Sequence, residues 1–224
     1  MPESPRVAVV RPFRTEDRAA VRRICHVTGF MGEPADWYWS DEESFADMWT
    51  GYYTDREPES AFVGEIGGRV VGYLLGCVDS RKAWNPADVG RRHSFHRGLP
   101  FRPGTAGMIW RAGRDFVSDV AHRSGTVRGP FLDSRWPAHL HIDILREGRG
   151  SGLGRALIDT WMERLRSLQS PGCHLETLAE NAKARAFFTT MGFETFGDPA
   201  LLPGARARDG SRLHNLVMVR SVHP

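Results

Sequence analysis

The sequence predicts a mixed α/β protein, of the α+β kind, built on a mostly antiparallel central sheet flanked by helices. Two observations lead to this prediction. The expected elements follow one another as strand, helix, helix, strand, strand, then a long segment rich in Gly, Pro and Arg, then strand, helix, strand, helix, strand, strand. This order suits an antiparallel sheet with one parallel pair in its middle. In addition, a glycine-rich turn joins one of the later strands directly to an amphipathic helix.

The first strand and the first two helices are predicted from β-branched residues, capping signals and apolar spacing. Residues 7–10 are a short β-branched run. Residues 15–17 offer an N-cap followed by acids, which helix N-termini prefer. Ser40 and Glu43 form the pattern of a capping box. The residues after it are apolar at helical spacing, namely Phe45, Met48, Trp49 and Tyr52.

A β-hairpin is expected next, from residues 61–66 and 70–78 with Gly67 and Gly68 at its turn. Residues 80–137 then read as an insertion that holds one helix, near residues 108–122. We expect this insertion to lie within a single domain that spans residues 1–224.

The second half of the chain has sharper signals. An apolar strand at residues 140–145 is interrupted by His141 and Asp143. The helix after the glycine-rich turn carries a stripe of apolar residues four apart, Leu153, Leu157, Trp161 and Leu165. The remaining elements are expected as a strand at 174–178, a helix at 181–191 that ends at Gly192, and strands at 193–196 and 215–220 around a Pro/Gly loop.

Composition places the chain among ordinary globular proteins. Its 224 residues are 41% hydrophobic and 25% charged, and no apolar run is long enough to span a bilayer. The three cysteines, Cys25, Cys77 and Cys173, form no C-x-x-C pair. We therefore expect a cytoplasmic protein without disulfides and without membrane association.

The insertion carries most of the positive charge. Between Arg81 and Trp136, eleven Lys and Arg residues outnumber four acids, a net charge of +7, whereas the whole chain has +3. Two interpretations stay open: a solvated basic surface, or a patch that attracts an anionic ligand or partner. The arginines lack the interleaved aromatics of a nucleic-acid module, so no nucleic-acid partner is expected.

The segment Arg146–Gly154 predicts a phosphate or pyrophosphate site. Its glycines let successive backbone N–H groups face one concavity, and the following helix N-terminus adds its positive dipole end. A P-loop is excluded because no Gly-Lys-Ser/Thr follows. A Rossmann site remains an alternative, with Glu176 as the ribose-binding acid, but too few βα units follow the motif.

Two motifs resemble those of the GCN5-related N-acetyltransferases (GNAT). Arg149-x-x-Gly152-x-Gly154 is similar to the pyrophosphate loop of this family. The run from Glu180 and Asn181 to Gly192 and Phe193 is similar to the helix that follows it in that family. Weaker similarity, at residues 11–13, 72–79 and 137–144, resembles the acetyltransferase-like C-terminal domain of O-GlcNAcases and its bacterial relatives.

The resemblance implies the GNAT fold with a long insertion between the third and fourth strands. It also implies acetyl-CoA as cofactor and direct transfer of its acetyl group to a small-molecule or peptide amine. The implied cofactor-binding residues are Ile144, Leu145, Arg149, Gly150, Ser151, Gly152, Leu153, Gly154, Arg155, Asn181, Ala184, Phe187 and Phe188.

Proton transfer has its own candidates. His141 and Asp143 lie two apart on one strand face within an apolar run, so they are either a hydrogen-bonded structural pair or the general base. Glu176 is a further candidate. The family's usual general-acid tyrosine is replaced by Phe188. Thr189 and Thr190 are weak substitutes, and Cys173 reads as structural rather than as an acyl carrier.

The acceptor side and the partners are less defined. Four aromatic residues, Trp37, Tyr38, Trp39 and Trp49, are candidates for either the core or the acceptor groove. No metal is implied by the histidine spacing, and the last strands would permit a homodimer. An acetyl-CoA-binding protein that has lost catalysis is the competing functional hypothesis, and Phe188 is the residue that favours it.

Overall fold

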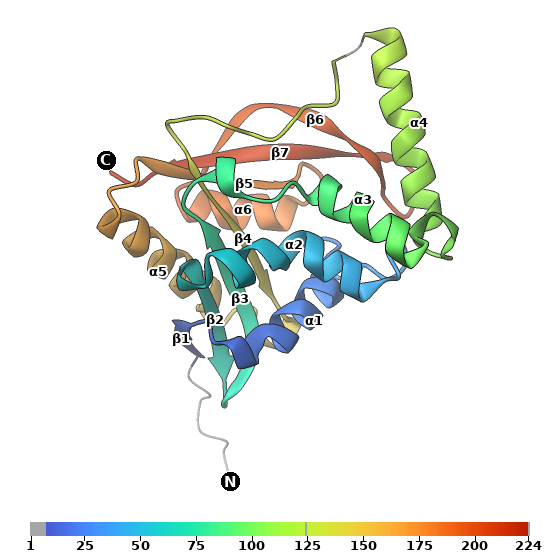
Figure 1. The fold of residues 1–224 in the computed structure, drawn as a ribbon. Coiled ribbons are helices and arrows are strands. Elements are labelled where there is room, and N and C mark those ends of the chain that lie inside the picture. The colour runs from blue at the N-terminus through green and yellow to red at the C-terminus, as the bar shows by residue number, and fades with distance from the viewer. Residues whose placement is uncertain (1–7, 124, 224) are drawn as a thin grey trace.

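The computed structural model describes residues 8–123 and 125–223, and part of the first predicted strand, Val7, lies outside them. A seven-stranded sheet with strand order β1-β2-β3-β4-β5-β7-β6 forms the centre of the protein (Figure 1). Every neighbouring pair is antiparallel except β4 and β5, which are parallel. The strands are β1 (Ala8–Pro12), β2 (Ala61–Ile66), β3 (Arg69–Cys77), β4 (Ala138–Ile144), β5 (Gly172–Leu178), β6 (Glu194–Arg206) and β7 (Arg212–Ser221). The predicted mixed, mostly antiparallel sheet is confirmed.

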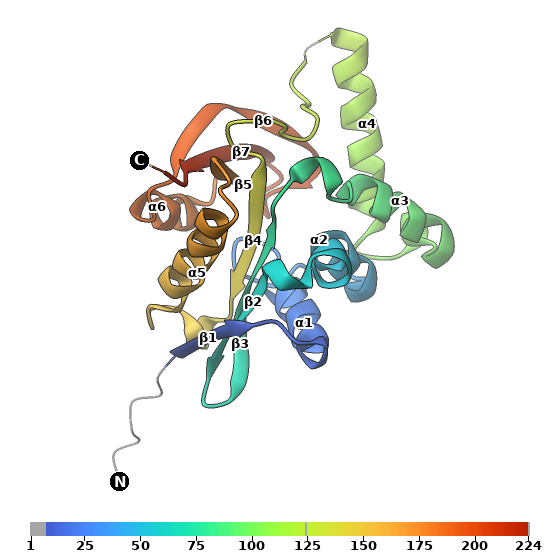
Figure 2. The same ribbon diagram turned by 60° about the vertical axis from the view of Figure 1, so that its left-hand side comes forward.

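Helices cover both faces of the sheet. α5 and α6 lie on one face and α1 and α2 on the other (Figure 2). The helices are α1 (Arg18–Thr28), α2 (Glu42–Arg56), α3 (Pro86–Arg97), α4 (Ala106–His122), α5 (Leu153–Ser167) and α6 (Ala182–Thr190). No helix in the described ranges is both long and apolar enough to cross a membrane.

The alternation of side chains along the strands divides the interior into two cores. Leu74 of β3 and Leu140 of β4 pack under α5 and α6, together with the apolar stripe of α5. Tyr73 and Leu75 of β3 point to the opposite face and pack against α1 and α2. His141 and Asp143 therefore also face α1 and α2, because they alternate with Leu140 along β4.

Within its described residues, the insertion contains two α-helices rather than the one expected. α4 matches the predicted helix near residues 108–122, but α3 was missed. Its sequence has no apolar stripe, and it begins at Pro86 because the Asn85 side chain caps the Ala87 N–H at 2.9 Å. α4 extends away from the sheet beside β6 and β7 (Figure 1).

One buried carboxylate ties the insertion to α2. The N-cap of α2 is Asp41, which accepts the Ser44 N–H at 3.1 Å, and not Ser40 as the capping-box pattern predicted. Asp41 also accepts hydrogen bonds from Arg97 at 2.8 Å and from Arg102 at 2.6 Å. Both arginines belong to the basic insertion, so part of its charge neutralises a buried acid.

The closing strands differ from the prediction in length. β6 runs through the expected Pro/Gly loop, with register shifts against β7 between Phe196 and Ala200 and between Leu201 and Arg206. It is the edge strand at this end of the sheet, and prolines and irregular pairing blunt an edge. A homodimer through these strands stays a prediction.

Candidate functional site

The sheet opens between its two parallel strands. β4 pairs with β5 only through Ala138 with Cys173 and His139 with His174, whereas β5 pairs with β7 along its whole length. From Leu140 onward, β4 therefore leaves β5 and stays with β3 alone. We call the region between these two diverging strands the β4–β5 slot; along it, β4 has no ladder partner on its β5 side.

The register shows which backbone groups of β4 face this slot. The Leu145 N–H donates to Val71 O at 2.8 Å, so it belongs to the β3 side. Because antiparallel partners alternate in direction, the backbone N–H and C=O groups of Ile144 and Ile142 face β5 instead. The Leu145 N–H is thus already bonded to β3, whereas the backbone groups of Ile144 face away from β3; cofactor contact by either residue stays a prediction.

The glycine loop closes the end of the slot. Gly150 and Gly152 have φ of +77° and +83°, and a Cβ added at either would meet nothing within 4 Å. Their backbone thus needs glycine and leaves open space beside the loop. Gly152 is the N-cap of α5, and Gly154 and Arg155 follow in its first turn, where N–H groups have no intrahelical acceptor. Ser151 is exposed, and its hydroxyl donates to Gly148 O at 2.7 Å.

α6 approaches the loop at one glycine. A Cβ on Gly154 would lie 3.0 Å from Cζ of Phe187 and 3.3 Å from Cδ1 of Ile144, so α5, α6 and β4 meet there. Asn181 is the N-cap of α6, and its Oδ1 accepts the Ala184 N–H at 3.2 Å. The structure thus brings the two sequence motifs together, while the Asn181 oxygen is used as a helix cap.

Arg149, a predicted cofactor contact, makes two hydrogen bonds within the fold. Its guanidinium donates to Ile144 O at 3.0 Å and to Gly32 O at 2.7 Å. Gly32 lies between α1 and α2 with φ of +86°. The side chain of Arg149 therefore joins the α1–α2 connection to the end of β4, rather than being left free for a phosphate.

Two further predicted cofactor contacts lie in the core. Leu153 is buried and packs under the sheet against Gly64. Phe188 is 7% exposed and stacks edge-on against Phe193, with ring centroids 5.9 Å apart. Position 188 therefore offers a phenyl ring within the hydrophobic core, and not the hydroxyl of the tyrosine that is usual in the family.

On the other face of β4, the structure brings His141 and Asp143 together. His141 Nε2 lies 3.4 Å from Oδ2 of Asp143, and the two side chains are 28% and 17% exposed. Burial raises the pKa of Asp143 above its usual range, although His141 and the Tyr73 hydroxyl oppose that shift. The pair is thus partly accessible and is suited to hold one proton.

Two neighbours of this pair were not predicted as site residues. The Tyr73 hydroxyl donates to Asp143 Oδ2 at 2.7 Å from the directly opposite position on β3. His141 Nδ1 faces Trp49 O at 3.1 Å, and the Trp49 ring, 40% exposed, flanks the imidazole with a centroid distance of 6.1 Å. Tyr73 could have been suspected from sequence, because a tyrosine in a buried strand needs a partner for its hydroxyl.

The other aromatic candidates divide between core and surface. Trp39 is buried and donates from Nε1 to Ser44 Oγ at 2.9 Å. Trp37 and Tyr38 pack with Phe30, and Arg208 lies over the Trp37 ring at 5.1 Å. Among the residues that the structure describes, Trp49 is the one of these four whose ring contacts His141, so it is the aromatic at the site.

The remaining candidates lie outside the site. Cys173 is buried with its sulfur 3.8 Å from that of Met162, and burial raises its pKa to about 12, which suits a structural cysteine. Glu176 is exposed and accepts a hydrogen bond from Asn215. Threonines 189 and 190 are exposed on α6, and the Thr190 hydroxyl donates to Phe187 O at 2.7 Å.

Several arginines of the basic insertion are paired away from His141 and Asp143. Besides Arg97 and Arg102 on Asp41, Arg81 pairs with Asp79 and Arg135 with Asp133, each at 2.7 to 2.8 Å. These four arginines therefore each face a local carboxylate rather than the His141–Asp143 pair.

Comparisons with known proteins agree with the fold. The crystal structure of SsHAT is 28% identical, covers 97% of this chain and 100% of its own, and superposes with a TM-score of 0.67. The chain has the GNAT fold. Residues 108–195, from α4 into β6, match the family model of the acetyltransferase (GNAT) domain. This segment contains the whole glycine loop and α6.

Two more GNAT structures have lower identity. The structure of yncA from Salmonella typhimurium, determined with its cofactor acetyl-CoA, is 16% identical over 96% of this chain and 94% of its own, with a TM-score of 0.56. The ribosomal-protein-S18-alanine N-acetyltransferase from Escherichia coli is 17% identical over 96% and 94%, with a TM-score of 0.53. At these identities, the likeness concerns the GNAT fold.

Proposed function

We propose that this protein transfers an acetyl group from acetyl-CoA directly to an amine acceptor. The observation that carries the proposal is the position of the β4–β5 slot. It ends at the Gly150–Gly152 loop on the α5 side, while His141 and Asp143 project from the same strand toward α1 and α2. One ligand along the slot would thus meet the glycine loop at its end and lie beside the strand that carries His141 and Asp143.

The residues around the slot suit acetyl-CoA. The open space beside Gly150 and Gly152 and the first-turn N–H groups of α5 fit a pyrophosphate. The backbone groups of Ile142 and Ile144 would hold an amide-bearing arm as a neighbouring strand does. Ala184 and Phe187 of α6 would cover that arm, because α6 meets the loop at Gly154. Acetyl-CoA, when bound, supplies the acetyl group and a thiolate leaving group.

The chain's own residues would provide base catalysis. The acceptor reaches the site as an ammonium ion and must lose a proton before its nitrogen can attack a carbonyl carbon. We assign Asp143, with His141 beside it, to take that proton. The Tyr73 hydroxyl fixes the carboxylate and the Trp49 carbonyl fixes the imidazole ring. Trp49 is the residue over which the acceptor would approach.

No general acid is needed for the leaving group. A thiol has an ordinary pKa of about 8.5, so its thiolate can leave without being protonated in the same step. Phe188 is consistent with such a mechanism. It also favours the competing hypothesis, a protein that binds acetyl-CoA without turning it over. Such a protein would bind acetyl-CoA, and a substitution in the glycine loop would weaken that binding. It would, however, acetylate none of a broad panel of amines.

The binding step can be tested with a matched pair of glycine variants. Gly150→Val introduces a side chain into the loop at φ of +77°, and Gly68→Val introduces the same strain at φ of +75° in the β2–β3 turn, where a Cβ also meets nothing. Calorimetric titration with acetyl-CoA should show micromolar binding by the wild type and by Gly68→Val, and at least tenfold weaker binding by Gly150→Val. Failure of the folded wild type to bind would overturn the proposal.

Three narrower expectations remain proposals. The weaker motifs support a relation to the acetyltransferase-like domain of O-GlcNAcases. The three cysteines are all free and buried, which supports a cytoplasmic location. The acceptor is proposed only as a small-molecule or peptide amine.

A further inference from the structure

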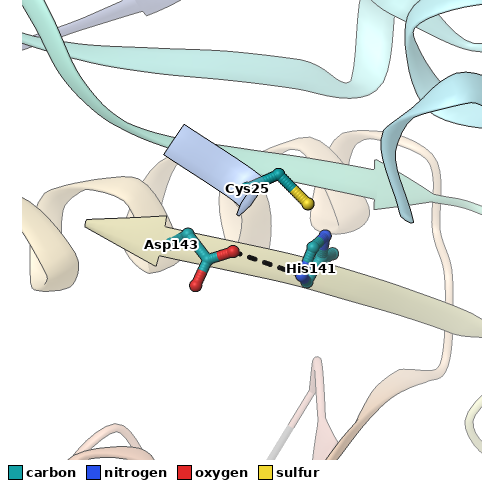
Figure 3. Close-up of side chains that lie close together, drawn as sticks. All are labelled: Cys25, His141 and Asp143. Carbon is teal, nitrogen blue, oxygen red and sulfur yellow. Dashed lines mark ion pairs between the residues drawn. The ribbon is translucent and has the colours of Figure 1, made fainter. Parts of the chain in front are cut away.

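Three side chains with metal-binding atoms meet beside the proposed site. Cys25 comes from α1, and His141 and Asp143 come from β4 (Figure 3). One sulfur, one ring nitrogen and one carboxylate oxygen lie within 4.8 Å of one another. Cys25 is distant in sequence from the other two, so the cluster is produced by packing α1 against β4.

The hydrogen bond of the imidazole leaves one nitrogen free to act as a ligand. Nδ1 of His141 lies 3.1 Å from the carbonyl oxygen of Trp49, which can only accept, so Nδ1 carries the hydrogen. In the neutral ring, Nε2 then presents a lone pair toward Oδ2 of Asp143 at 3.4 Å. Two acceptors that face each other at this distance need a proton or a cation between them.

His141 and Asp143 each also form a hydrogen bond to a residue outside the three-residue cluster. Metal-binding histidines typically donate their second N–H to a carbonyl or carboxylate, and metal-binding carboxylates are themselves hydrogen-bonded. The Trp49 carbonyl provides the first of these contacts and the Tyr73 hydroxyl, 2.7 Å from Asp143, provides the second. The imidazole ring of His141 and the carboxylate of Asp143 are thus held in place before any ion binds.

The donor set selects the kind of metal. One thiolate, one imidazole and one carboxylate suit Zn²⁺ better than Mg²⁺ or Ca²⁺, which prefer oxygen ligands. Zinc bonds of about 2.0 to 2.3 Å require ligand atoms roughly 3.3 to 3.8 Å apart, so the three groups must close by about 1 Å. His141 is 28% exposed and gives the ion an entry path, while Cys25 is 1% exposed.

We propose that Cys25, His141 and Asp143 bind one Zn²⁺ ion, with a fourth position open to solvent. Binding replaces the proton of the Cys25 thiol, and any proton shared by His141 and Asp143, with the metal. The ion would then occupy the lone pairs that we assign to the general base. This second consequence rests on the proposed function: zinc bound here should inhibit acetyl transfer, and a chelator should restore it.

Metal binding is tested on the full chain without acetyl-CoA, so the result does not depend on acetyl transfer. Chelator-treated protein is dialysed against micromolar Zn²⁺ and its metal content is measured. Co²⁺ is then used as a spectroscopic probe, because a Cys ligand produces a thiolate-to-cobalt charge-transfer band. The wild type should bind one equivalent of zinc and show that band.

The variants separate this site from other metal-binding side chains. Cys25→Ala and His141→Gln should weaken zinc binding at least tenfold, and Cys25→Ala should abolish the charge-transfer band. Cys173→Ala removes another buried cysteine, from the opposite core, and should bind zinc as the wild type does. Circular dichroism confirms that each variant is folded. The proposal is overturned if the folded wild type binds no zinc, or if Cys25→Ala binds it equally well.

The two proposals can fail separately. Zinc binding by a protein that does not bind acetyl-CoA would refute the proposed function and support the metal site. Acetyl transfer that is unaffected by zinc, in a protein that holds one equivalent at Cys25, would keep both and disprove only the inhibition.

Discussion

The phenolic hydroxyl of Tyr73 donates a 2.7 Å hydrogen bond to Oδ2 of Asp143, directly across from it in the β3–β4 register. The tyrosine is fully buried, and the Asp143 side chain is only 17% exposed. An unmatched buried carboxylate is costly, so this single contact helps to explain how a charged residue is tolerated in a central strand.

Tyr73→Phe should therefore lower the free energy of unfolding by about 1–3 kcal/mol, the usual cost of leaving a buried polar group unsatisfied. Urea unfolding measures this loss. The control is Tyr38→Phe, which removes a hydrogen bond to a backbone carbonyl, Gly29 O at 3.1 Å, and should cost about 1 kcal/mol or less. Adding Asp143→Asn to Tyr73→Phe gives a double-mutant cycle, and a coupling energy near zero would contradict the importance of the contact.

Asp143→Asn should separate binding from catalysis. The amide keeps the shape of the side chain but cannot take a proton, so kcat should fall by about 10²–10⁴-fold. The Kd for acetyl-CoA should stay within about twofold of the wild type, because the glycine loop is intact. Steady-state kinetics, with the amine that screening identifies, and calorimetry measure the two effects.

Glu176→Gln is the matched control for Asp143→Asn. Glu176 is exposed on the neighbouring strand β5 and pairs with Asn215. Its amide variant should keep kcat within about twofold of the wild type. A large loss of kcat in Glu176→Gln with little loss in Asp143→Asn would show that the general base lies on β5 and not on β4.

Arg149→Ala tests whether this side chain serves the fold or the cofactor. Loss of its bonds to Ile144 O and Gly32 O should reduce the free energy of unfolding by about 1–3 kcal/mol and speed amide exchange in residues 29–34. Arg155→Ala, an exposed neighbour on α5, should change stability by less than about 0.5 kcal/mol. Unchanged stability with a tenfold loss of acetyl-CoA affinity would instead support the role that the family motif suggests.

Asp41 should make stability depend on pH in acid. Burial alone would raise its pKa, but hydrogen bonds from Arg97 and Ser44 outweigh burial and lower the pKa to about 2. A carboxyl whose folded pKa lies below its unfolded value of about 3.9 stabilises the fold above that value, and loses this contribution as pH falls toward 2. The shift corresponds to about 2–3 kcal/mol.

The comparison that isolates this effect uses Asp41→Asn. Urea unfolding at pH 7 should show the variant to be less stable by about 2 kcal/mol or more. Between pH 4 and pH 2 the difference should shrink, because the wild type then loses the same charge. A difference that stays constant over this range would show that Asp41 does not titrate as its contacts indicate.

Local patterns predicted the frame of the molecule but not every element. The glycine loop, the α5 stripe and the two-residue spacing of His141 and Asp143 depend on near neighbours in sequence, so they could be recognised. α3 could not be predicted from periodicity, because it carries no apolar stripe and meets α2 through Arg97, His93 and the close approach of Gly90 to Met48. β6 was shortened in the prediction because its prolines and glycines, typical of loops, sit on an edge strand.

The site was predicted in part for the same reason. Alternation along one strand placed His141 and Asp143 on a common face, but no pattern connects Cys25 on α1 with them. The position of Arg149 likewise depends on Gly32, which reaches it only after α1 and α2 have packed. Contacts between residues far apart in sequence thus account for what the sequence did not reveal.

The short pairing of β4 with β5 has a mechanical consequence. The sheet consists of two antiparallel blocks, β1 to β4 and β5 to β7, each built from a continuous stretch of chain and bridged by only two residue pairs. This seam is the place where the sheet can flex at least cost. A molecule bound along this seam would contact both blocks. Bound acetyl-CoA should therefore make the two blocks unfold as one cooperative unit and protect the backbone amides of both from hydrogen exchange.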